Sequence, residues 1–219
     1  QKKEYAIIQK EAGTGLRIAS VIGLPASLGM SLLAEPILML LFSGDQYTLA
    51  QLQKGARLLE ISSLTIWLFT MVQATSGILQ GLHKQRIPMY TLALGVVMKV
   101  LLNYTLVRLP AINIHGAPFA SLLCYGVSLV PNLYYVAKYG KTRLSFSELV
   151  LRPGGATLAM ALCVLGFKAA LGSKLNHSIL WLGLCILAAM AVFFAAALKL
   201  KAIHTEDIPR KLRRKKPHA

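Results

Sequence analysis

Acidic residues are scarce in this chain of 219 residues, which has 8 Asp and Glu against 24 Lys and Arg. Charged residues of either sign make up only 15% of the chain, whereas 55% of its residues are hydrophobic. One soluble core of this size does not bury so much apolar surface, and the surplus is typical of proteins that lie in lipid. The shortage of charge therefore excludes an ordinary soluble domain and predicts an integral membrane protein.

The residue patterns of metal sites and catalytic centres are also missing. The 3 cysteines all fall inside hydrophobic runs, without a CxxC pair or a histidine at zinc-binding spacing. The 5 histidines lie in polar segments, and none accompanies a nucleophile and an acid in a recognisable pattern. A Gly-Lys-Ser/Thr phosphate loop is absent. We therefore expect no enzyme activity, no metal and no cofactor.

The net charge of +16 has two possible explanations. A nucleic-acid-binding surface would interleave basic and aromatic residues along one stripe. In this sequence the basic residues lie between and after the apolar runs, as they do in the cytoplasmic loops of membrane proteins. We therefore expect membrane lipids, and not nucleic acid, to be the partners of the basic segments.

Long apolar runs account for most of the chain. A transmembrane helix needs roughly 20 apolar residues, and about six suitable runs occur, at 15–42, 58–82, 89–107, 117–136, 156–171 and 179–198. Pro25 and Pro36 in the first run predict a kinked helix. Small residues at helical spacing, such as Ala74 with Gly77, favour close helix packing. The predicted fold is all-α, a polytopic bundle of about six transmembrane helices.

The polar segments between these runs predict how the chain is organised along its length. A lead-in at 1–14 precedes four transmembrane helices within 15–136, a cytoplasmic loop at 137–155 follows, and two additional helices within 156–200 end in a basic tail at 201–219. Within this scheme we expect a polar connector at 45–57 and tight turns at 83–88 and 172–177. The start at Gln1 shows no signal peptide and is typical of the middle of a longer chain.

The orientation follows from the basic residues. Apart from Lys54, Arg57, Arg108 and Lys174, the Lys and Arg that lie outside the runs all fall on the side of the two termini. Because basic loops accumulate in the cytoplasm, both ends of this chain are predicted to be cytoplasmic. The expected location is the cytoplasmic membrane of a bacterial cell.

Polar side chains inside the runs are the candidates for substrate binding, because an ionisable group at membrane depth needs a cavity or a partner. Lys99 and Asn103 lie one turn apart on one helix face, where they either line a polar lumen or satisfy each other structurally. Gln73 and Gln80 lie two turns apart in the second run, where they either bind a sugar or bond another helix.

Two charged residues lie near the ends of the first run. Arg17 is at its cytoplasmic mouth, where a guanidinium either clamps a phosphate or anchors the helix. Glu35 precedes Pro36 near the outer end, and we expect a structural ion pair with Lys54 or Arg57.

Several short segments carry a resemblance to a known family. In order along the chain they are Gly15-Leu16-Arg17, Leu24-Pro25-Ala26, Gly29, Pro36, Leu41-Phe42, Gln80-Gly81, Pro88, Lys99 with Asn103, Gly116-Ala117 and Ala120-Ser121. Their order and spacing resemble the C-terminal part of the polysaccharide and lipid-linked-oligosaccharide flippases of the MOP superfamily. The most similar branch is that of stage V sporulation protein B and the murein-precursor (lipid II) flippases.

This resemblance implies a transporter that works by alternating access. Two lobes enclose a cationic cavity for a pyrophosphate-sugar headgroup, and the lipid tail follows a groove formed by the last two helices. The substrate is then a lipid-linked oligosaccharide or a polyprenyl-pyrophosphate sugar, used to build polysaccharide, peptidoglycan or spore cortex. The implied partner is the N-terminal lobe. This chain lacks that lobe and the first two helices of the second lobe, and the resemblance places most of the family's headgroup-binding arginines in the absent part.

Three other functions remain open on the sequence. A drug or small-solute exporter of the same superfamily would show proton- or sodium-linked efflux. A non-transporting membrane interaction subunit would show no transport. A membrane-embedded transferase would need clustered acids for a metal diphosphate, and only Glu148, Glu206 and Asp207 lie near the cytoplasmic side.

Overall fold

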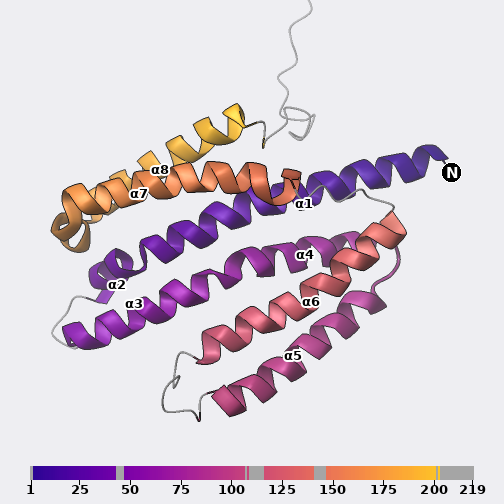
Figure 1. Ribbon diagram of the computed structural model, residues 1–219, viewed down its shortest axis with the longest axis horizontal. Coiled ribbons are helices and arrows are strands. Elements are labelled where there is room, and N and C mark those ends of the chain that lie inside the picture. The colour runs from indigo at the N-terminus through magenta and orange to yellow at the C-terminus, as the bar shows by residue number, and fades with distance from the viewer. Residues whose placement is uncertain are drawn as a thin grey trace, which may run out of the picture.

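The computed structural model describes residues 2–42, 47–106, 108, 116–140, 147–200 and 202, and for 2–10 and 172–177 it describes the backbone alone. Over these residues the chain is helical and contains no strand, which confirms the predicted all-α class. The helices are α1 (Lys2–Leu32), α2 (Ala34–Phe42), α3 (Leu49–Ser63), α4 (Thr65–Gly81), α5 (Arg86–Leu106), α6 (Gly116–Gly140), the π-helix η2 (Ser147–Leu151), α7 (Arg152–His177) and α8 (Ile179–Lys199). They lie side by side in one bundle (Figure 1).

The described helices supply 6 candidate membrane spans, in which between 6% and 33% of the residues are buried inside the chain. The least buried span is α5, whose Val96, Val100 and Leu101 all remain exposed. Apolar faces of this extent need lipid around them. The chain is therefore part of a multi-pass membrane protein.

The first apolar run breaks in the way that its prolines predict. Helix α1 continues through Pro25, ends at Leu32 and gives way to α2 after a single turn residue. Pro36 lies in the first turn of α2, where its missing N–H leaves no intrahelical bond unmade. The end of α1 is capped from another helix, because Lys168 Nζ of α7 donates a hydrogen bond to the Leu32 carbonyl at 3.2 Å.

The predicted polar connector at 45–57 is wrong from Leu49 onward, where α3 begins. Thr48 caps this helix reciprocally with Gln51: the Gln51 N–H donates to Thr48 Oγ1 at 3.4 Å, and the Thr48 N–H donates to Gln51 Oε1 at 2.9 Å. The sequence Thr48-Leu-Ala-Gln51 carries this capping signal. As a result α3 and α4 form one span, Leu49–Gly81, and Asp45 with Gln46 lies outside the described residues.

The turn predicted at 83–88 is confirmed, but it is shorter than predicted because α5 begins at Arg86. His83 adopts a φ of 57°, while the His83 N–H donates to the Gln80 carbonyl at 2.9 Å and the Lys84 N–H to the Leu79 carbonyl at 2.8 Å. This pair of bonds closes a Schellman motif at the end of α4. The turn predicted at 172–177 is wrong, because α7 remains helical to His177 and the extended backbone begins at Ser178.

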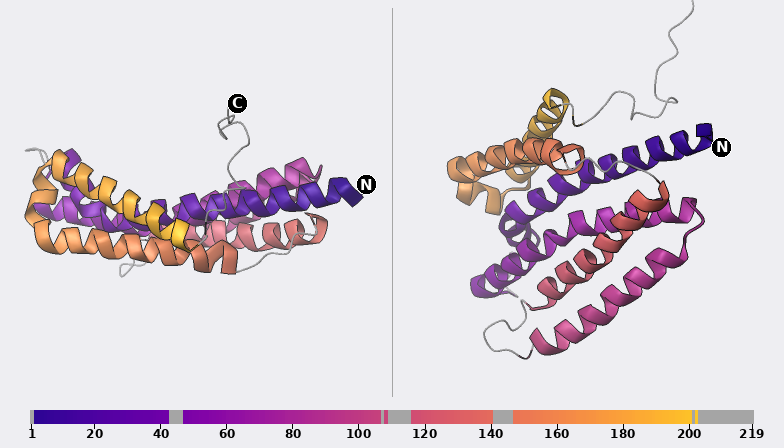
Figure 2. Two further views of the ribbon diagram at one scale, coloured as in Figure 1. Left: turned by 90° about the horizontal axis from the view of Figure 1, so that it is seen from above. Right: turned by 45° about the vertical axis from the view of Figure 1, so that its right-hand side comes forward.

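Two clusters of buried side chains hold the bundle together, and α1 with the turn that follows it contributes to both. One cluster joins α1 to α4 and α6 through Leu16, Ala19, Met71, Val72, Leu79, Leu129 and Val136. The other joins Leu33 to α7 and α8 through residues that include Ala156, Met160, Val164, Leu182, Cys185, Ala189 and Phe193. Figures 1 and 2 show α1 between the α7–α8 pair on one side and α4, α6 and α5 on the other.

Apart from Lys99, the described basic residues of α3 to α8 gather at the ends of the bundle. The N-terminus, the α4–α5 turn and the end of α6 lie at the same end (Figure 1). We call this the basic end, and its members on α4 to α8 are Lys84, Arg86, Lys138, Arg152 and Lys199. The opposite end has Lys54, Arg57, Arg108 and Lys168.

Candidate functional site: a polar pocket and an apolar groove

The structure brings Lys99 and Asn103 together in a pocket of about 340 Å³. Helix α5 supplies both residues, and the remaining walls come from the α3–α4 junction and the start of α6. The other lining residues are Ser62, Thr65, Ala117, Pro118 and Ser121. We call this the polar pocket.

Hydrogen-bonding capacity is left unused inside the polar pocket. The Asn103 Oδ1 atom is buried and accepts no hydrogen bond from the described residues. Lys99 forms no ion pair with any carboxylate in the described part of the chain. The Thr65 hydroxyl of α4 donates to the Ser62 carbonyl at the end of α3 at 2.6 Å, and the Ser121 hydroxyl donates to the Ala117 carbonyl of its own helix at 3.1 Å. The pocket therefore offers an ammonium group as donor and a carboxamide oxygen and hydroxyl oxygens as acceptors.

Lys99 places a charged group of the polar pocket far from both ends of α5. At about 1.5 Å of rise per residue, Lys99 lies roughly 20 Å from the start of α5 at Arg86 and roughly 10 Å from its end at Leu106. Both distances place the ammonium group inside the hydrocarbon layer, where a charge requires a cavity or a counter-charge. The described residues provide the cavity and no counter-charge.

The other candidates from the sequence lie elsewhere. Gln73 and Gln80 are exposed on one face of α4, and neither lines the polar pocket or bonds another described helix. Arg17 Nη2 donates to Glu148 Oε2 of η2 at 2.8 Å, and Arg152 Nη1 lies 3.6 Å from the other oxygen of the same carboxylate. Glu148 thus ties α1 to the start of α7. Sequence reasoning assigned no such partner to Arg17.

The ion pair predicted for Glu35 is wrong within the described residues. Glu35 and Arg57 line a common cavity of about 290 Å³ with Glu60 and Lys168, yet Glu35 pairs with neither Lys54 nor Arg57. The α1–α2 break places Glu35 beside the capped end of α1, and Arg57 and Glu60 stay exposed on α3. Solvent screens such groups, so little energy favours a close pair.

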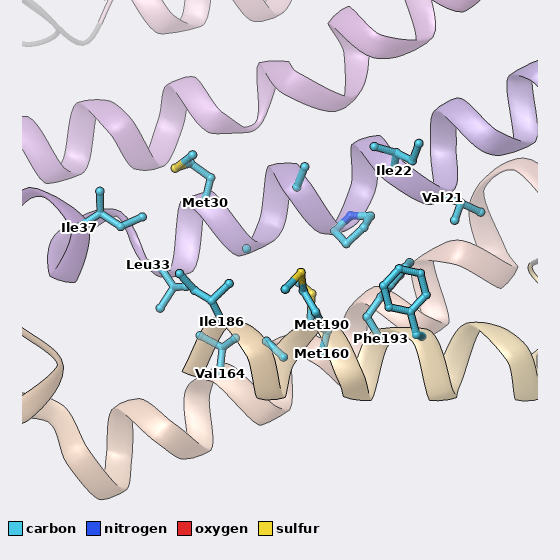
Figure 3. Close-up of a pocket in the computed structure, with 15 residues that line it drawn as sticks. Val21, Ile22, Met30, Leu33, Ile37, Met160, Val164, Ile186, Met190 and Phe193 are labelled. Atoms are coloured by element: carbon cyan, nitrogen blue, oxygen red, sulfur yellow. The ribbon is translucent and has the colours of Figure 1, made fainter. Parts of the chain in front are cut away.

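A third cavity is apolar, in contrast to the polar pocket. It has a volume of about 400 Å³ and lies between α1 and the α7–α8 pair (Figure 3). All of its walls are apolar, formed by Val21, Ile22, Pro25, Ala26, Gly29, Met30, Leu33, Ile37, Met160, Val164, Ile186, Ala189, Met190, Phe193 and Phe194. We call it the apolar groove. The family resemblance implies a groove formed by the last two helices, and here α1 adds the third wall.

Helices α5 and α6, which line the polar pocket, are joined by buried hydrogen bonds that sequence reasoning missed. Thr91 Oγ1 donates to Asn132 Oδ1 at 2.7 Å, and Ser128 Oγ lies 3.0 Å from the Thr91 carbonyl, which accepts its bond. Thr91, Ser128 and Asn132 are all buried. The signal in the sequence is a polar Asn next to Pro131 inside an apolar run, which calls for a partner on a neighbouring helix.

Comparison with known families finds a match to the first part of the chain. Residues 2–105, which cover α1 to α5, match the MatE family. The match confirms the predicted relationship to the MOP superfamily, and with it the fold class of a MATE-like helical bundle.

Two curated proteins of Bacillus subtilis (strain 168) are similar to the chain. The lipid II flippase MurJ is 27% identical over 135 residues, which is 62% of this chain and 24% of MurJ. The uncharacterized membrane protein YabM is 26% identical over 134 residues, or 61% of this chain and 23% of YabM. The matched region thus spans about a quarter of the length of these relatives.

Proposed function

We propose that this chain is the C-terminal part of a flippase that moves lipid-linked saccharide precursors across the bacterial cytoplasmic membrane by alternating access. The observation that carries the proposal is the pairing of two unlike cavities, the polar pocket and the apolar groove, within one bundle. A substrate with an anionic, hydroxyl-rich head and a long hydrocarbon tail uses both cavities. A small polar solute has no use for the second.

The polar pocket suits part of such a headgroup. An ammonium group acts as a point charge toward phosphate oxygens, and Lys99 has no competing carboxylate among the described residues. Sugar hydroxyls both donate and accept, so they match the open Asn103 Oδ1 and the hydroxyl oxygens of the pocket. The remaining contacts would come from the N-terminal lobe that the resemblance implies.

The apolar groove suits the tail. Hydrocarbon placed between α1 and α8 replaces contacts with membrane lipid, so the fit of the groove decides whether a chain stays there. Met30, Met160 and Met190 line it, and unbranched thioether side chains adapt to irregular shapes such as a branched polyprenyl chain. The groove holds the tail in the membrane while the head crosses through the lobes.

The same proposal includes the orientation of the chain in the membrane, the energy source and the cargo. The basic end faces the cytoplasm, because basic residues gather on that side of membrane proteins, so both ends of this chain are cytoplasmic. An ion gradient or the membrane potential drives the cycle. The similarity to MurJ favours a precursor of peptidoglycan, including that of the spore cortex, as the cargo.

The test is a flipping assay on the complete protein that contains this chain, reconstituted in liposomes. A fluorescent polyprenyl-pyrophosphate saccharide is added, and dithionite quenching reports the fraction of label in the outer leaflet. We expect flipping well above that of empty liposomes, and about tenfold slower flipping with Lys99→Ala than with Lys54→Ala, which removes the same charge from the exposed opposite end. Gradient-driven export of a small cationic dye without lipid flipping would instead establish the small-solute exporter.

A further inference from the structure

Two lysines from different segments converge on one tyrosine ring at the basic end. Lys84 Nζ lies 5.1 Å from the centroid of the Tyr139 ring, and Lys138 Nζ lies 5.8 Å from it. Lys84 comes from the α4–α5 turn and Lys138 from the last turn of α6. We call Lys84, Lys138 and Tyr139 the lysine–tyrosine cluster.

The backbone and the neighbouring rings hold this cluster in place. The Schellman motif at the end of α4 fixes the position of Lys84, because its own N–H donates to the Leu79 carbonyl at 2.8 Å. The Tyr139 ring stacks on Tyr135, with centroids 5.9 Å apart and an interplanar angle of 9°. The end of α4 and the end of α6 therefore bring the two lysines close to one tyrosine ring.

Carboxylates of the described residues do not neutralise the positive charge of the cluster. Neither lysine pairs with a carboxylate in the part of the chain that the structure describes. Glu148, the first described acid after Lys138 in the sequence, is already bonded to Arg17 and lies 3.6 Å from Arg152. A cation above a ring keeps its full charge, so both ammonium groups remain available to an anion.

The surroundings of the cluster indicate where that anion comes from. Tyr134 is 61% exposed and Tyr90 is 65% exposed on the outer faces of α6 and α5, close to the same end of both helices. Tyrosines at helix ends mark the level of lipid headgroups, and lysines at that level attract anionic lipids. The cluster thus lies where the phosphates of the adjacent leaflet are found.

We propose that the lysine–tyrosine cluster binds the phosphate of an anionic phospholipid in the leaflet at the basic end. The phosphate binds the ammonium groups of Lys84 and Lys138, both of which the structure places near the Tyr139 ring. This lipid is a resident of the α4–α6 side of the bundle, separate from the polar pocket and from the transported substrate. The site does not depend on the proposed flippase function.

The experiment measures retention of phosphatidylglycerol by the complete protein in detergent, using native mass spectrometry, with phosphatidylcholine as the neutral comparison. We expect the unmodified protein to retain phosphatidylglycerol at least tenfold better than the double variant Lys84→Gln/Lys138→Gln. The matched control, Lys54→Gln, makes the same kind of charge change at the opposite end and should bind like the unmodified protein. Equal losses in the double variant and the control would overturn the proposal.

Further variants and a competition experiment distinguish a lipid site from a failure to fold and from a site for free phosphate. Each single change, Lys84→Gln or Lys138→Gln, should weaken retention about threefold, which gives a result even where the double variant fails to fold. Lys84→Arg/Lys138→Arg should restore binding, because both charges remain. Competition by millimolar glycerol 3-phosphate as strong as that by phosphatidylglycerol would show a site for free phosphate and overturn the assignment to a lipid.

Discussion

The α5–α6 and α7–α8 pairs are both antiparallel helix hairpins, but different chemistry holds each together. Between α5 and α6 the buried contacts include hydrogen bonds, from Thr91 Oγ1 to Asn132 Oδ1 and from Ser128 Oγ to the Thr91 carbonyl. Between α7 and α8 they consist mainly of apolar side chains such as Val164, Cys185 and Phe193. Hydrogen bonds fix a register, whereas apolar packing in lipid competes with the lipid itself.

Gly95 shows how closely α5 and α6 approach each other. A Cβ at Gly95 of α5 would lie 2.8 Å from the Cys124 carbonyl oxygen of α6 and would also overlap Ser128 Oγ. Gly166 of α7 and Gly183 of α8 have no such neighbours within 4 Å of a Cβ. The α5–α6 pair is therefore a close-packed wall beside the polar pocket. The α7–α8 pair has an apolar interface, and its Gly166 and Gly183 leave room for a larger side chain.

The largest expected effect comes from forcing the close-packed wall apart. Gly95→Val places methyl groups against the Cys124 carbonyl, which belongs to backbone and does not move aside. We expect a loss of about 3 kcal/mol or more, at the upper end of the cost of overpacking, seen as a clear drop in Tm of the complete protein in detergent. The matched control is Gly183→Val on α8, which meets open space. Equal drops in Tm would show that the two pairs pack alike.

Filling the apolar groove should damage transport without damaging the fold. A Cβ at Gly29 would lie 3.5 Å from Met160 Cε, so Gly29→Phe projects a ring into the groove that α1 shares with α7. We expect flipping of a polyprenyl-linked saccharide to fall about tenfold while Tm stays close to that of the parent. Gly166→Phe, where a Cβ has no neighbour within 4 Å, is the control. Unchanged flipping in Gly29→Phe would remove the groove from the transport path.

A moderate effect is expected from the buried hydrogen bond of the α5–α6 pair. Thr91→Val keeps the shape of the side chain but leaves Asn132 Oδ1 without its donor, and Asn132 Nδ2 already has no partner among the described residues. Interhelical bonds of this kind contribute about 0.6 kcal/mol on average and up to about 1.7 kcal/mol. Thr105→Val, which removes an exposed bond within α5 itself, should change Tm less. The reverse order would contradict the assignment.

The smallest effect belongs to the bond between α1 and η2. The side chains of Arg17 and Glu148 are 18% and 36% exposed, so solvent screens their interaction. A double-mutant cycle with Arg17→Gln and Glu148→Gln should give a coupling below about 1 kcal/mol that shrinks as salt is added. A coupling of several kcal/mol that is insensitive to salt would make this pair a main fastening of the bundle.

Local patterns in the sequence predicted the parts of this structure that depend on local chemistry. Hydropathy measures the preference of a segment for lipid, and it located the apolar stretches of the 6 candidate spans. The pair Lys99 and Asn103 could be predicted because residues four apart share a helix face. The helical start at Leu49 was not predicted, because the polar residues of 45–57 are typical of a connector. The Thr48–Gln51 capping box is the local signal for this helix.

Contacts between distant segments could not be read from such patterns. Arg17 and Glu148 are 131 positions apart, and no local periodicity connects them. Ser62 and Thr65 join Lys99 only because the α3–α4 junction packs near α5 and α6. Similarly, α1 becomes the third wall of the apolar groove through the packing of the whole bundle. Helix-to-helix pairing therefore had to come from the structure.

The most direct test of the two-cavity account is a comparison of two ligands on two variants of the complete protein. One ligand is the whole polyprenyl-pyrophosphate saccharide, and the other is its water-soluble saccharide diphosphate head. We predict that Lys99→Ala weakens the binding of both ligands about tenfold, whereas Gly29→Phe weakens the binding of the whole lipid alone. Equal losses of both ligands in Gly29→Phe, or no loss of either in Lys99→Ala, would contradict the division of the substrate between the apolar groove and the polar pocket.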